Sequence, residues 1–556
     1  MSRPNFMGLF AATFFLAASM SPSLIPRHWL FQGAVSGIVT AAGYGLGVFL
    51  SYLWRRLPFR EPSTRIKEWA WRTLAVTGPV GVILMAVLGV GWQRQLHRRM
   101  DMTVPSGWGM VGAVLLGLVV AVGLVGIARA IRAAARRAGA TLGRWLPRPL
   151  ASLLGALLVG LLTIGLLDGV VVRAFFTTAD ETFRLSDEVV DDNAAQPTSP
   201  LRSGSPDSFA DWDDLGSKGR AFVAAGPTKD ELADFTGEPA LEPIRVYAGL
   251  ASTEDIHSRA ELAVAELERT GAFDRAVLCV ITTTGTGWVD PQAAAALEYI
   301  WSGDTALAAV QYSYLPSWLS FLVDSARAHE AGAEFFNVVY DHWSKLPEDD
   351  RPLLLVFGES LGADGSEAAF SGSADLSNRT DGVLWVGPPN FSELWSTFTS
   401  QRDPGTLERL PVYEGGETIR FAAGPEDLDP TGTPWKEPRV LYLQHASDPV
   451  VWWSSRLILR QPDWLREPPG PDVLHEVRWY PLVTFWQLSA DMANAKRVPA
   501  GHGHNYGGLF ADGWAAVASS PGWSQNDTDR LHDLLAAQAD AALSSVLGVR
   551  VTDPDL

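Results

Sequence analysis

The 556-residue sequence has a single cysteine, Cys279, and this scarcity limits the chemistry open to the chain. One cysteine forms no intramolecular disulfide and supplies no cysteine cluster for zinc. Because Cys279 lies inside an apolar run, we expect it to be a buried core residue. The H-E-x-x-H pattern of zinc proteases is also absent from the sequence, so we predict neither a metal nor another cofactor.

Positive charge is scarce after residue 173. The whole chain carries a formal charge of -18, yet residues 1–173 hold 18 Lys and Arg against 4 Asp and Glu. The remaining residues hold 26 basic and 58 acidic side chains. A surface this acidic excludes nucleic acid as a partner, because phosphate backbones require a positive surface. The length predicts about three or four structural units.

Long apolar runs fill the basic N-terminal part. They cover residues 7–25, 32–54, 74–92, 107–128 and 150–172. Each is near the ~20 residues that a helix needs to cross ~30 Å of hydrocarbon. We therefore predict an all-α domain of five transmembrane helices in residues 1–173. Glycines recur within these runs, which favours close approach of helix backbones.

Basic residues cluster in the loops after the second and fourth apolar runs, and these two loops share one side of the membrane. By the positive-inside rule this side is the cytoplasm, and the N-terminus lies there too. Five spans then place everything after Arg173 outside the cytoplasm. We expect a multi-pass protein of the cell membrane whose C-terminal domain is extracytoplasmic.

The remainder of the chain divides at about residue 240. Residues 174–240 are acidic and rich in Ser, Pro, Gly and Asp, which predicts a linker or a surface segment. Residues 241–556 alternate apolar strands with helical stretches, so we expect a mainly parallel, doubly wound sheet. The predicted strands are 244–247, 276–282, 307–312, 353–357, 382–386, 440–444 and 476–480, and an amphipathic helix is expected over 527–547.

A nucleophile motif follows the fourth predicted strand. The strand leads into Gly358-Glu359-Ser360-Leu361-Gly362, which fits the G-x-S-x-G elbow. A turn sharp enough to expose the serine hydroxyl leaves no room for side chains two residues away, so glycine is needed there. A helix-compatible segment comes next, and the amide of Leu361 at its start is a candidate oxyanion donor.

A serine nucleophile needs a histidine base and an acid, in the chain order Ser, acid, His for doubly wound hydrolases. The acid candidate is Asp448, which follows an apolar strand, whereas Asp364 lies too close to Ser360 in sequence. His502 and His504 both lie in the glycine-rich run 499–508. His502 is our first choice for the base and His504 the second.

The second oxyanion donor is expected in the loop after the predicted strand 276–282. This loop carries Thr284 and Gly285, and both amides are candidates. Its Gly-x-Gly pattern lacks the third glycine of a dinucleotide site.

These motifs together resemble the actinobacterial membrane-anchored alpha/beta-hydrolase family. The resemblance lies in the five spans and in T-T-T-G-T-G-W, G-E-S-L-G, H-A-S-D-P and P-A-G-H-G-H-N-Y. It implies an alpha/beta-hydrolase fold with Ser360 as nucleophile and Asp448 and a histidine of the G-H-G-H run as partners. One departure is the segment 482–496 before the histidines, which we expect to wall an acyl pocket or to rest on the membrane.

The sequence therefore predicts a membrane-anchored serine hydrolase or acyltransferase of the cell envelope. It would act through a Ser-His-Asp triad and an acyl-enzyme, and its substrate would be a lipid or lipid-linked ester. Its partners would be the lipid bilayer and this ester. The alternative is a transporter or scaffold membrane protein whose outer, hydrolase-like domain is not catalytic.

Overall fold

The computed structural model describes residues 4–57, 63–164, 194–315, 325–429 and 432–547. The chain forms two compact units. The first comprises Met1–Ala179, Ser455–Leu465 and Val473–Asn494, and the second comprises Asp180–Ser454, Arg466–Asp472 and Ala495–Leu556. The first unit therefore takes segments from two distant parts of the chain.

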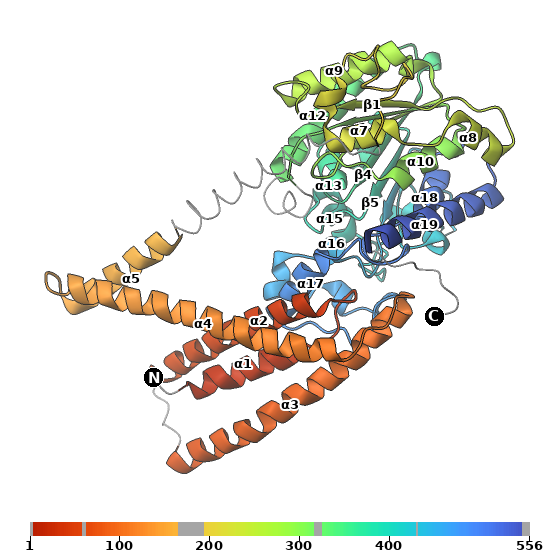
Figure 1. Ribbon diagram of the computed structural model, residues 1–556. Coiled ribbons are helices and arrows are strands. Elements are labelled where there is room, and N and C mark those ends of the chain that lie inside the picture. The colour runs from red at the N-terminus through yellow and green to blue at the C-terminus, as the bar shows by residue number, and fades with distance from the viewer. Residues whose placement is uncertain (1–3, 58–62, 165–193, 316–324, 430–431, 548–556) are drawn as a thin grey trace. The chain divides into compact units, whose positions relative to one another are not determined.

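The N-terminal part of the first unit is helical (Figure 1). Its helices are α1 (Phe6–Ala18), α2 (Trp29–Trp54), α3 (Thr64–Arg99), α4 (Trp108–Leu142) and α5 (Arg148–Ile164). Among the described residues, only α2, α3 and α4 are long and apolar enough to cross a membrane. Large apolar side chains on α3 and α4 are exposed, as expected of lipid-facing helices.

In the part of the chain that the structure describes, three helices, and not the predicted five, are long and apolar enough to cross a membrane. The first apolar run forms α1, which ends after 13 residues, because the polar segment from Ser19 to Ser23 interrupts it. At 1.5 Å per residue this helix is too short to span a bilayer. The fifth run forms the 17-residue α5 and continues beyond the described residues.

Glycine brings α2 close to its neighbours. A Cβ on Gly37 would lie 2.5 Å from the Cβ of Val120 on α4, and a Cβ on Gly47 would overlap the carbonyl oxygen of Met7 on α1. Small residues at such contacts allow the tight backbone packing that holds membrane helices together.

Residues from late in the chain complete the first unit. They form η7 (Ser455–Ile458), η8 (Asp463–Leu465) and α17 (Val483–Met492). Val483 of α17 is buried in one cluster with Phe15, Val35 and Val39. Asp491 of the same helix forms a buried ion pair with Arg27. The predicted insertion at 482–496 therefore packs, through α17, on α1, α2 and the connection between them.

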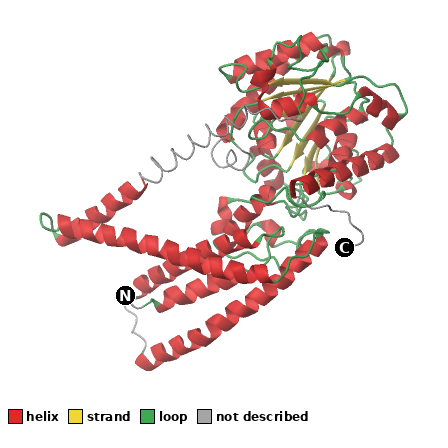
Figure 2. Cartoon of the chain, viewed as in Figure 1, coloured by secondary structure: helices red, strands yellow, loops and turns green. Residues whose placement is uncertain are grey.

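The second unit is built around a seven-stranded sheet (Figure 2). Its strands are β1 (Ile244–Ala248), β2 (Val277–Thr282), β3 (Thr305–Val310), β4 (Leu353–Glu359), β5 (Gly382–Val386), β6 (Ile419–Ala422) and β7 (Arg439–Leu443). Their order is β1-β3-β2-β4-β5-β7-β6, and every pair is parallel. The strands are almost entirely buried, which explains their continuous apolar sequences.

Helices cover both faces of this sheet, as expected for an alpha/beta-hydrolase fold. One face carries α9 (Ile256–Thr270), α12 (Ser325–Trp343) and α13 (Leu361–Glu367), and the other carries α10 (Pro291–Ile300), α18 (Leu509–Val517) and α19 (Gln525–Leu547). The remaining elements are η2 (Trp212–Leu215), α7 (Gly216–Ala224), α8 (Lys229–Thr236), η3 (Ala272–Asp274), η4 (Glu348–Asp350), α14 (Ser373–Arg379), α15 (Glu393–Ser400), η5 (Glu414–Gly416), η6 (Pro425–Asp427) and α16 (Pro449–Trp452). Cys279 is buried in β2, and the closing helix predicted over 527–547 is α19.

One predicted strand differs from the structure. The seventh strand of the sheet is β6, whereas the predicted strand 476–480 is irregular and belongs to the first unit. The predicted linker or surface segment, 174–240, lies outside the described residues up to residue 193. From residue 194 on, it includes η2, α7 and α8, and α7 packs against β1.

Candidate active site

The G-x-S-x-G motif forms a strained turn between β4 and α13. Ser360 has φ 56° and ψ -127°, a conformation that costs a non-glycine residue energy and that marks nucleophile elbows. Its amide donates to the carbonyl oxygen of Val386 at 2.8 Å. A Cβ on Gly358 would lie 2.5 Å from the carbonyl oxygen of Gly362, and a Cβ on Gly362 would overlap that of Thr282. The tight turn therefore requires both glycines.

Asp448 and His504 form a buried hydrogen-bonded pair. Asp448 caps the N-terminus of α16, and its Oδ1 accepts from the amide of Val450 at 2.8 Å. Its Oδ2 accepts from Nδ1 of His504 at 2.7 Å and from the hydroxyl of Tyr506 at 2.7 Å. The imidazole is 3 % exposed and the carboxylate 0 %. Donation from Nδ1 leaves Nε2 of His504 as the acceptor, the form a general base needs.

Two residues near Ser360, Gly387 and Glu359, lie beside the imidazole of His504. Val386 accepts from the Ser360 amide, and a Cβ on the next residue, Gly387, would lie 2.7 Å from Nδ1 of His504. Glu359, which precedes the serine, has its Oε1 3.6 Å from Nε2 of His504. The ends of β4, β5 and β7 and the run 499–508 thus converge at one edge of the sheet.

No hydrogen bond joins Ser360 Oγ to His504 among the residues that the structure describes, where Nε2 of His504 is buried without a hydrogen-bond partner. Catalytic hydrogen bonds are often long in ligand-free enzymes and tighten when the substrate binds. The buried Nε2 of His504 is therefore available to accept a proton.

The structure pairs His504, the second choice of the sequence analysis, with Asp448. His502, the first choice, instead has its Nδ1 3.4 Å from Oδ2 of Asp472. The same carboxylate accepts from the hydroxyl of Ser447. The two histidines therefore belong to different carboxylates, and only His504 has the partner predicted for the base.

The predicted oxyanion donors have different partners in this structure. The amide of Thr284 donates to the carbonyl oxygen of Trp288 at 3.0 Å, and the amide of Gly285 donates to the hydroxyl of Tyr312 at 3.1 Å. Either amide would have to exchange its acceptor to bind an oxyanion. The amide of Leu361 is the first of α13, so no carbonyl within the helix can accept from it.

A charged cluster missed by the sequence analysis lies beside the elbow. Lys496 places its Nζ 2.7 Å from Oε1 of Glu359 and 3.9 Å from Oδ2 of Asp290. The same ammonium lies 3.6 Å from the centre of the Trp288 ring. Burial, and then the charge of Glu359, raise the pKa of Asp290 to about 7, while Lys496 lowers it. Glu359 thus places negative charge where an imidazolium would form on His504. Because any residue can occupy the position before the serine in G-x-S-x-G, the motif did not predict this role for Glu359.

Replacing Gly387 with alanine tests the convergence of these segments. The new Cβ would overlap Cε1 of His504 and displace the imidazole, and a shift of about 1 Å at a catalytic group lowers rates by about 10²-fold. We expect such a loss in ester hydrolysis. The matched control is Gly415→Ala, because Gly415 has φ +67° against +54° for Gly387 and its Cβ would meet nothing within 4 Å. Equal activity of both variants would contradict the placement of His504.

Two family models match the chain. A family model described as Alpha/beta-hydrolase family matches residues 244–531, and one described as Alpha/beta-hydrolase family N-terminus matches residues 20–227. No curated protein and no solved structure matches the chain. The two matched ranges together cover most of both units.

Proposed function

Because the chain belongs to the alpha/beta-hydrolase family, we propose that it is a membrane-anchored serine hydrolase or acyltransferase. Ser360 would be the nucleophile, His504 the base and Asp448 the acid. The observation that carries this proposal is the 2.7 Å hydrogen bond from Nδ1 of His504 to Asp448, beside a strained Ser360 elbow. An ester of a lipid or lipid-linked molecule of the cell envelope fits a chain with apolar membrane-spanning helices.

The three residues have distinct tasks in the proposed reaction. Nε2 of His504 takes the proton of Ser360 as Oγ forms a bond to the ester carbonyl carbon. The oxyanion of the tetrahedral intermediate is stabilised by the amide of Leu361 and the positive end of the α13 dipole. His504 then protonates the departing alcohol, and the acyl group stays on Ser360. Asp448 remains ionised and stabilises the imidazolium.

The second half of the reaction repeats these proton movements with a new nucleophile. Water or an alcohol gives its proton to Nε2 of His504 and attacks the acyl carbon, and Ser360 leaves with that proton. Water yields a carboxylic acid, whereas an envelope alcohol yields a new ester. Both outcomes use the same residues.

Hydrolysis of a chromogenic short-chain ester by the full-length protein in detergent tests this proposal. We expect turnover by the wild-type protein and a loss of about 10⁴-fold or more in Ser360→Ala, because the acyl-enzyme cannot form. Adding a long-chain alcohol as acceptor separates transfer from hydrolysis through the product formed. Equal hydrolysis by Ser360→Ala would contradict a serine nucleophile, and an inactive wild-type protein would favour the transporter or scaffold alternative.

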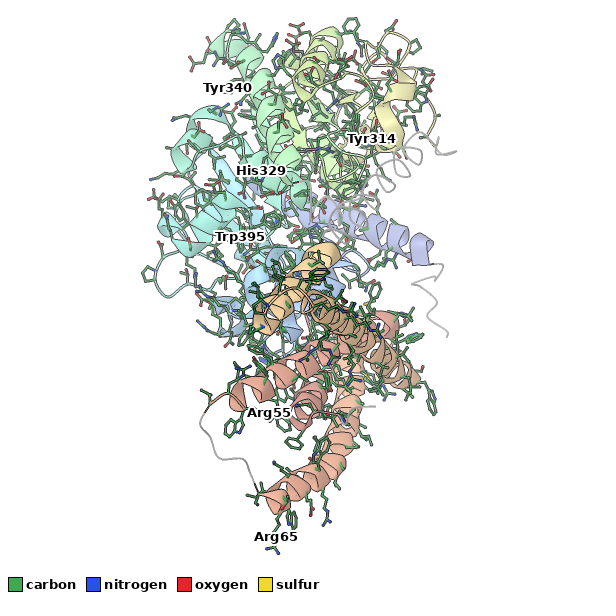
Figure 3. The ribbon with its side chains drawn as sticks, turned by 90° about the vertical axis from the view of Figure 1, so that its left-hand side faces the viewer. Arg55, Arg65, Tyr314, His329, Tyr340 and Trp395 are labelled. Atoms are coloured by element: carbon green, nitrogen blue, oxygen red, sulfur yellow. The ribbon has the colours of Figure 1, made fainter. Side chains whose placement is uncertain are left out.

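We further propose that the second unit lies outside the cytoplasm. Basic residues gather at the end of α2 and the start of α3, where Figure 3 labels Arg55 and Arg65. The C-terminal half of α4 is also basic. The positive-inside rule puts these helix ends in the cytoplasm. α17 packs instead on the connection between α1 and α2, which precedes the opposite end of α2. This placement requires the apolar run 150–172 to cross the membrane as well.

Cysteine labelling in intact cells tests this topology, and the single, buried Cys279 keeps the background low. We expect a membrane-impermeant maleimide to label the exposed position 401 in Gln401→Cys. The exposed position 68 of α3, in Glu68→Cys, should react only after permeabilisation. The reverse pattern would place the second unit in the cytoplasm.

A further inference from the structure

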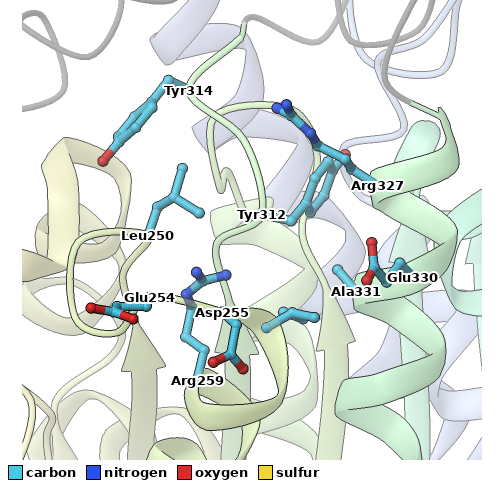
Figure 4. Close-up of a pocket in the computed structure, with 10 residues that line it drawn as sticks. Leu250, Glu254, Asp255, Arg259, Tyr312, Tyr314, Arg327, Glu330 and Ala331 are labelled. Atoms are coloured by element: carbon cyan, nitrogen blue, oxygen red, sulfur yellow. The ribbon is translucent and has the colours of Figure 1, made fainter.

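A cavity of about 360 Å³ lies in the second unit and has no task in the proposed triad (Figure 4). It is lined by segments that follow β1 and β3 and by residues of α9 and α12. These residues are Leu250, Glu254, Asp255, Ile256, Arg259, Tyr312, Tyr314, Arg327, Glu330 and Ala331. In a parallel sheet the ends of β1 and β3 lie at the same edge as the end of β4, where ligands of open α/β sheets bind.

The cavity wall is directly connected to the residues around the nucleophile. Tyr312 accepts from the amide of Gly285, in the loop proposed to flank the oxyanion. Tyr312 and Ala331 also pack in one buried cluster with Leu361, the residue after Ser360. Gln311, which precedes Tyr312, donates to the carbonyl oxygen of Thr286 in that loop. A ligand in this cavity would therefore contact the walls that support the nucleophile.

The chemistry of the cavity is set by Arg259, a guanidinium of α9 that is only 4 % exposed. Its Nη1 donates to the carbonyl oxygen of Gln311 at 3.1 Å, and its Nη2 to that of Thr253 at 3.4 Å. Its Nε has no hydrogen-bond partner, and no carboxylate of the described residues forms an ion pair with it. The nearby charge of Asp255 favours the guanidinium, but no hydrogen bond joins the two side chains. A buried cation that no anion bonds directly is unfavourable, and a negatively charged ligand that bonds to it would relieve this cost.

Figure 4 shows the guanidinium groups of Arg259 and Arg327 directed into the same opening from α9 and α12. The three carboxylates of the lining surround these groups, with Asp255 beside Arg259 and with Glu254 and Glu330 on either side. Asp255 already caps α9 by accepting from the amide and the hydroxyl of Ser258. Glu254 and Glu330 are exposed to solvent. The buried charge of the lining is therefore that of Arg259, while Leu250 and the two tyrosine rings supply apolar surface.

We propose that this cavity binds an anionic group of the substrate, a phosphate or a carboxylate, with Arg259 as its principal ligand. This inference rests on the proposed function and narrows it to an ester that carries an anionic group near the scissile bond. Guanidinium groups bind such oxygen anions through charge-assisted hydrogen bonds. Apolar parts of the same molecule would pack on Leu250, Tyr312 and Tyr314.

A binding experiment tests the cavity without relying on catalysis. Full-length Ser360→Ala protein in detergent is titrated with short-chain phosphatidic acid, inorganic phosphate and succinate. We expect at least one to bind, and Arg259→Gln added to this background should weaken that binding about tenfold or more. Binding of the lipid alone identifies a lipid headgroup, whereas binding of phosphate or succinate identifies a small anion. No binding, or unchanged binding in the Arg259→Gln variant, would overturn the proposal.

Two further variants keep the result interpretable. Arg259 also supports two backbone carbonyls, so Arg327→Gln, at an exposed position, is the second test and should weaken the same ligand severalfold. The control is Arg530→Gln on α19, on the other face of the sheet, which should leave binding unchanged.

A kinetic measurement uses protein that retains Ser360. In ester hydrolysis by this protein, Arg259→Gln should raise KM for an anionic ester but leave KM for a neutral ester unchanged. Binding that persists without any hydrolysis would refute the enzyme and retain the site.

Discussion

Replacing His504 with alanine is expected to lower ester hydrolysis by about 10⁴-fold, whereas His502→Ala should retain activity within about tenfold. The loss of a triad base removes the acceptor for the serine proton, and rates then fall by several orders of magnitude. His504 bonds to Asp448 and carries a buried Nε2 that has no hydrogen-bond partner among the described residues. His502 is 3.4 Å from Asp472 and is not held by Asp448.

The rate of hydrolysis of one chromogenic ester, measured for both variants at saturating substrate, decides between the two histidines. Their melting temperatures provide the control, because both histidines lie in the same glycine-rich run and either substitution could disturb it. An inactive, folded His502→Ala with an active His504→Ala would reverse the assignment. Asp472 would then be the acid, through the network it forms with Ser447 and His502.

Breaking the ion pair between Arg27 and Asp491 is expected to destabilise the first unit by about 3–5 kcal/mol, because either single substitution leaves an uncompensated buried charge. Arg27 Nε lies 3.0 Å from Oδ1 of Asp491, and the two side chains are 1 % and 0 % exposed. Further hydrogen bonds hold both groups, from the amide of Leu24 to Asp491 and from Arg27 to Gln32. Asp491→Ala should therefore lower the melting temperature of the full-length protein in detergent.

Two variants make this expectation specific. The exchange Arg27→Asp with Asp491→Arg should recover part of the loss, since opposite charges again meet in the same place. Arg129→Ala on α4 is the control, because Arg129 is exposed and its bond to the hydroxyl of Tyr44 contributes little. A melting temperature of Asp491→Ala equal to that of the wild-type protein would show that the pair does not hold α17 in place.

The position of α17 in the chain connects this ion pair with the segment between Asp448 and His504. The chain leaves the second unit for Ser455–Leu465, returns to it for Arg466–Asp472, and leaves again for Val473–Asn494 before it returns at Ala495. These two excursions separate Asp448 from His504 in sequence. The N-terminal helices thus hold a segment that lies between the acid and the base, so they have a structural task in addition to attachment to a membrane.

Local patterns were sufficient to predict much of the second unit. Six of the seven strands follow from apolar runs in the sequence. The elbow at Ser360 and the loop that carries Asp448 follow from the glycines and the Asp-Pro pair that come after two of these runs. β6 was missed because it has only four residues and includes a charged one, Arg420. The stretch 476–480 was predicted as a strand from its side-chain types, but it packs in the first unit without a partner strand in the described sheet.

Other features depend on contacts that no local pattern contains. His502 and His504 are one residue apart among the same glycines, so only the path of the loop decides which of them reaches Asp448. Lys496 meets Glu359 across 137 positions, and Arg27 meets Asp491 across 464. The number of candidate spans was overestimated because hydropathy alone does not show where α1 ends, at the serines that join the polar contacts with α17.

Mass spectrometry of the full-length protein after reaction with a fluorophosphonate probe tests the central claim most directly. The account predicts one adduct, on the peptide that contains Ser360, in the wild-type protein, and strongly reduced labelling in His504→Ala. An adduct on another residue, or an unlabelled and folded wild-type protein, would contradict a serine nucleophile activated by His504 and Asp448.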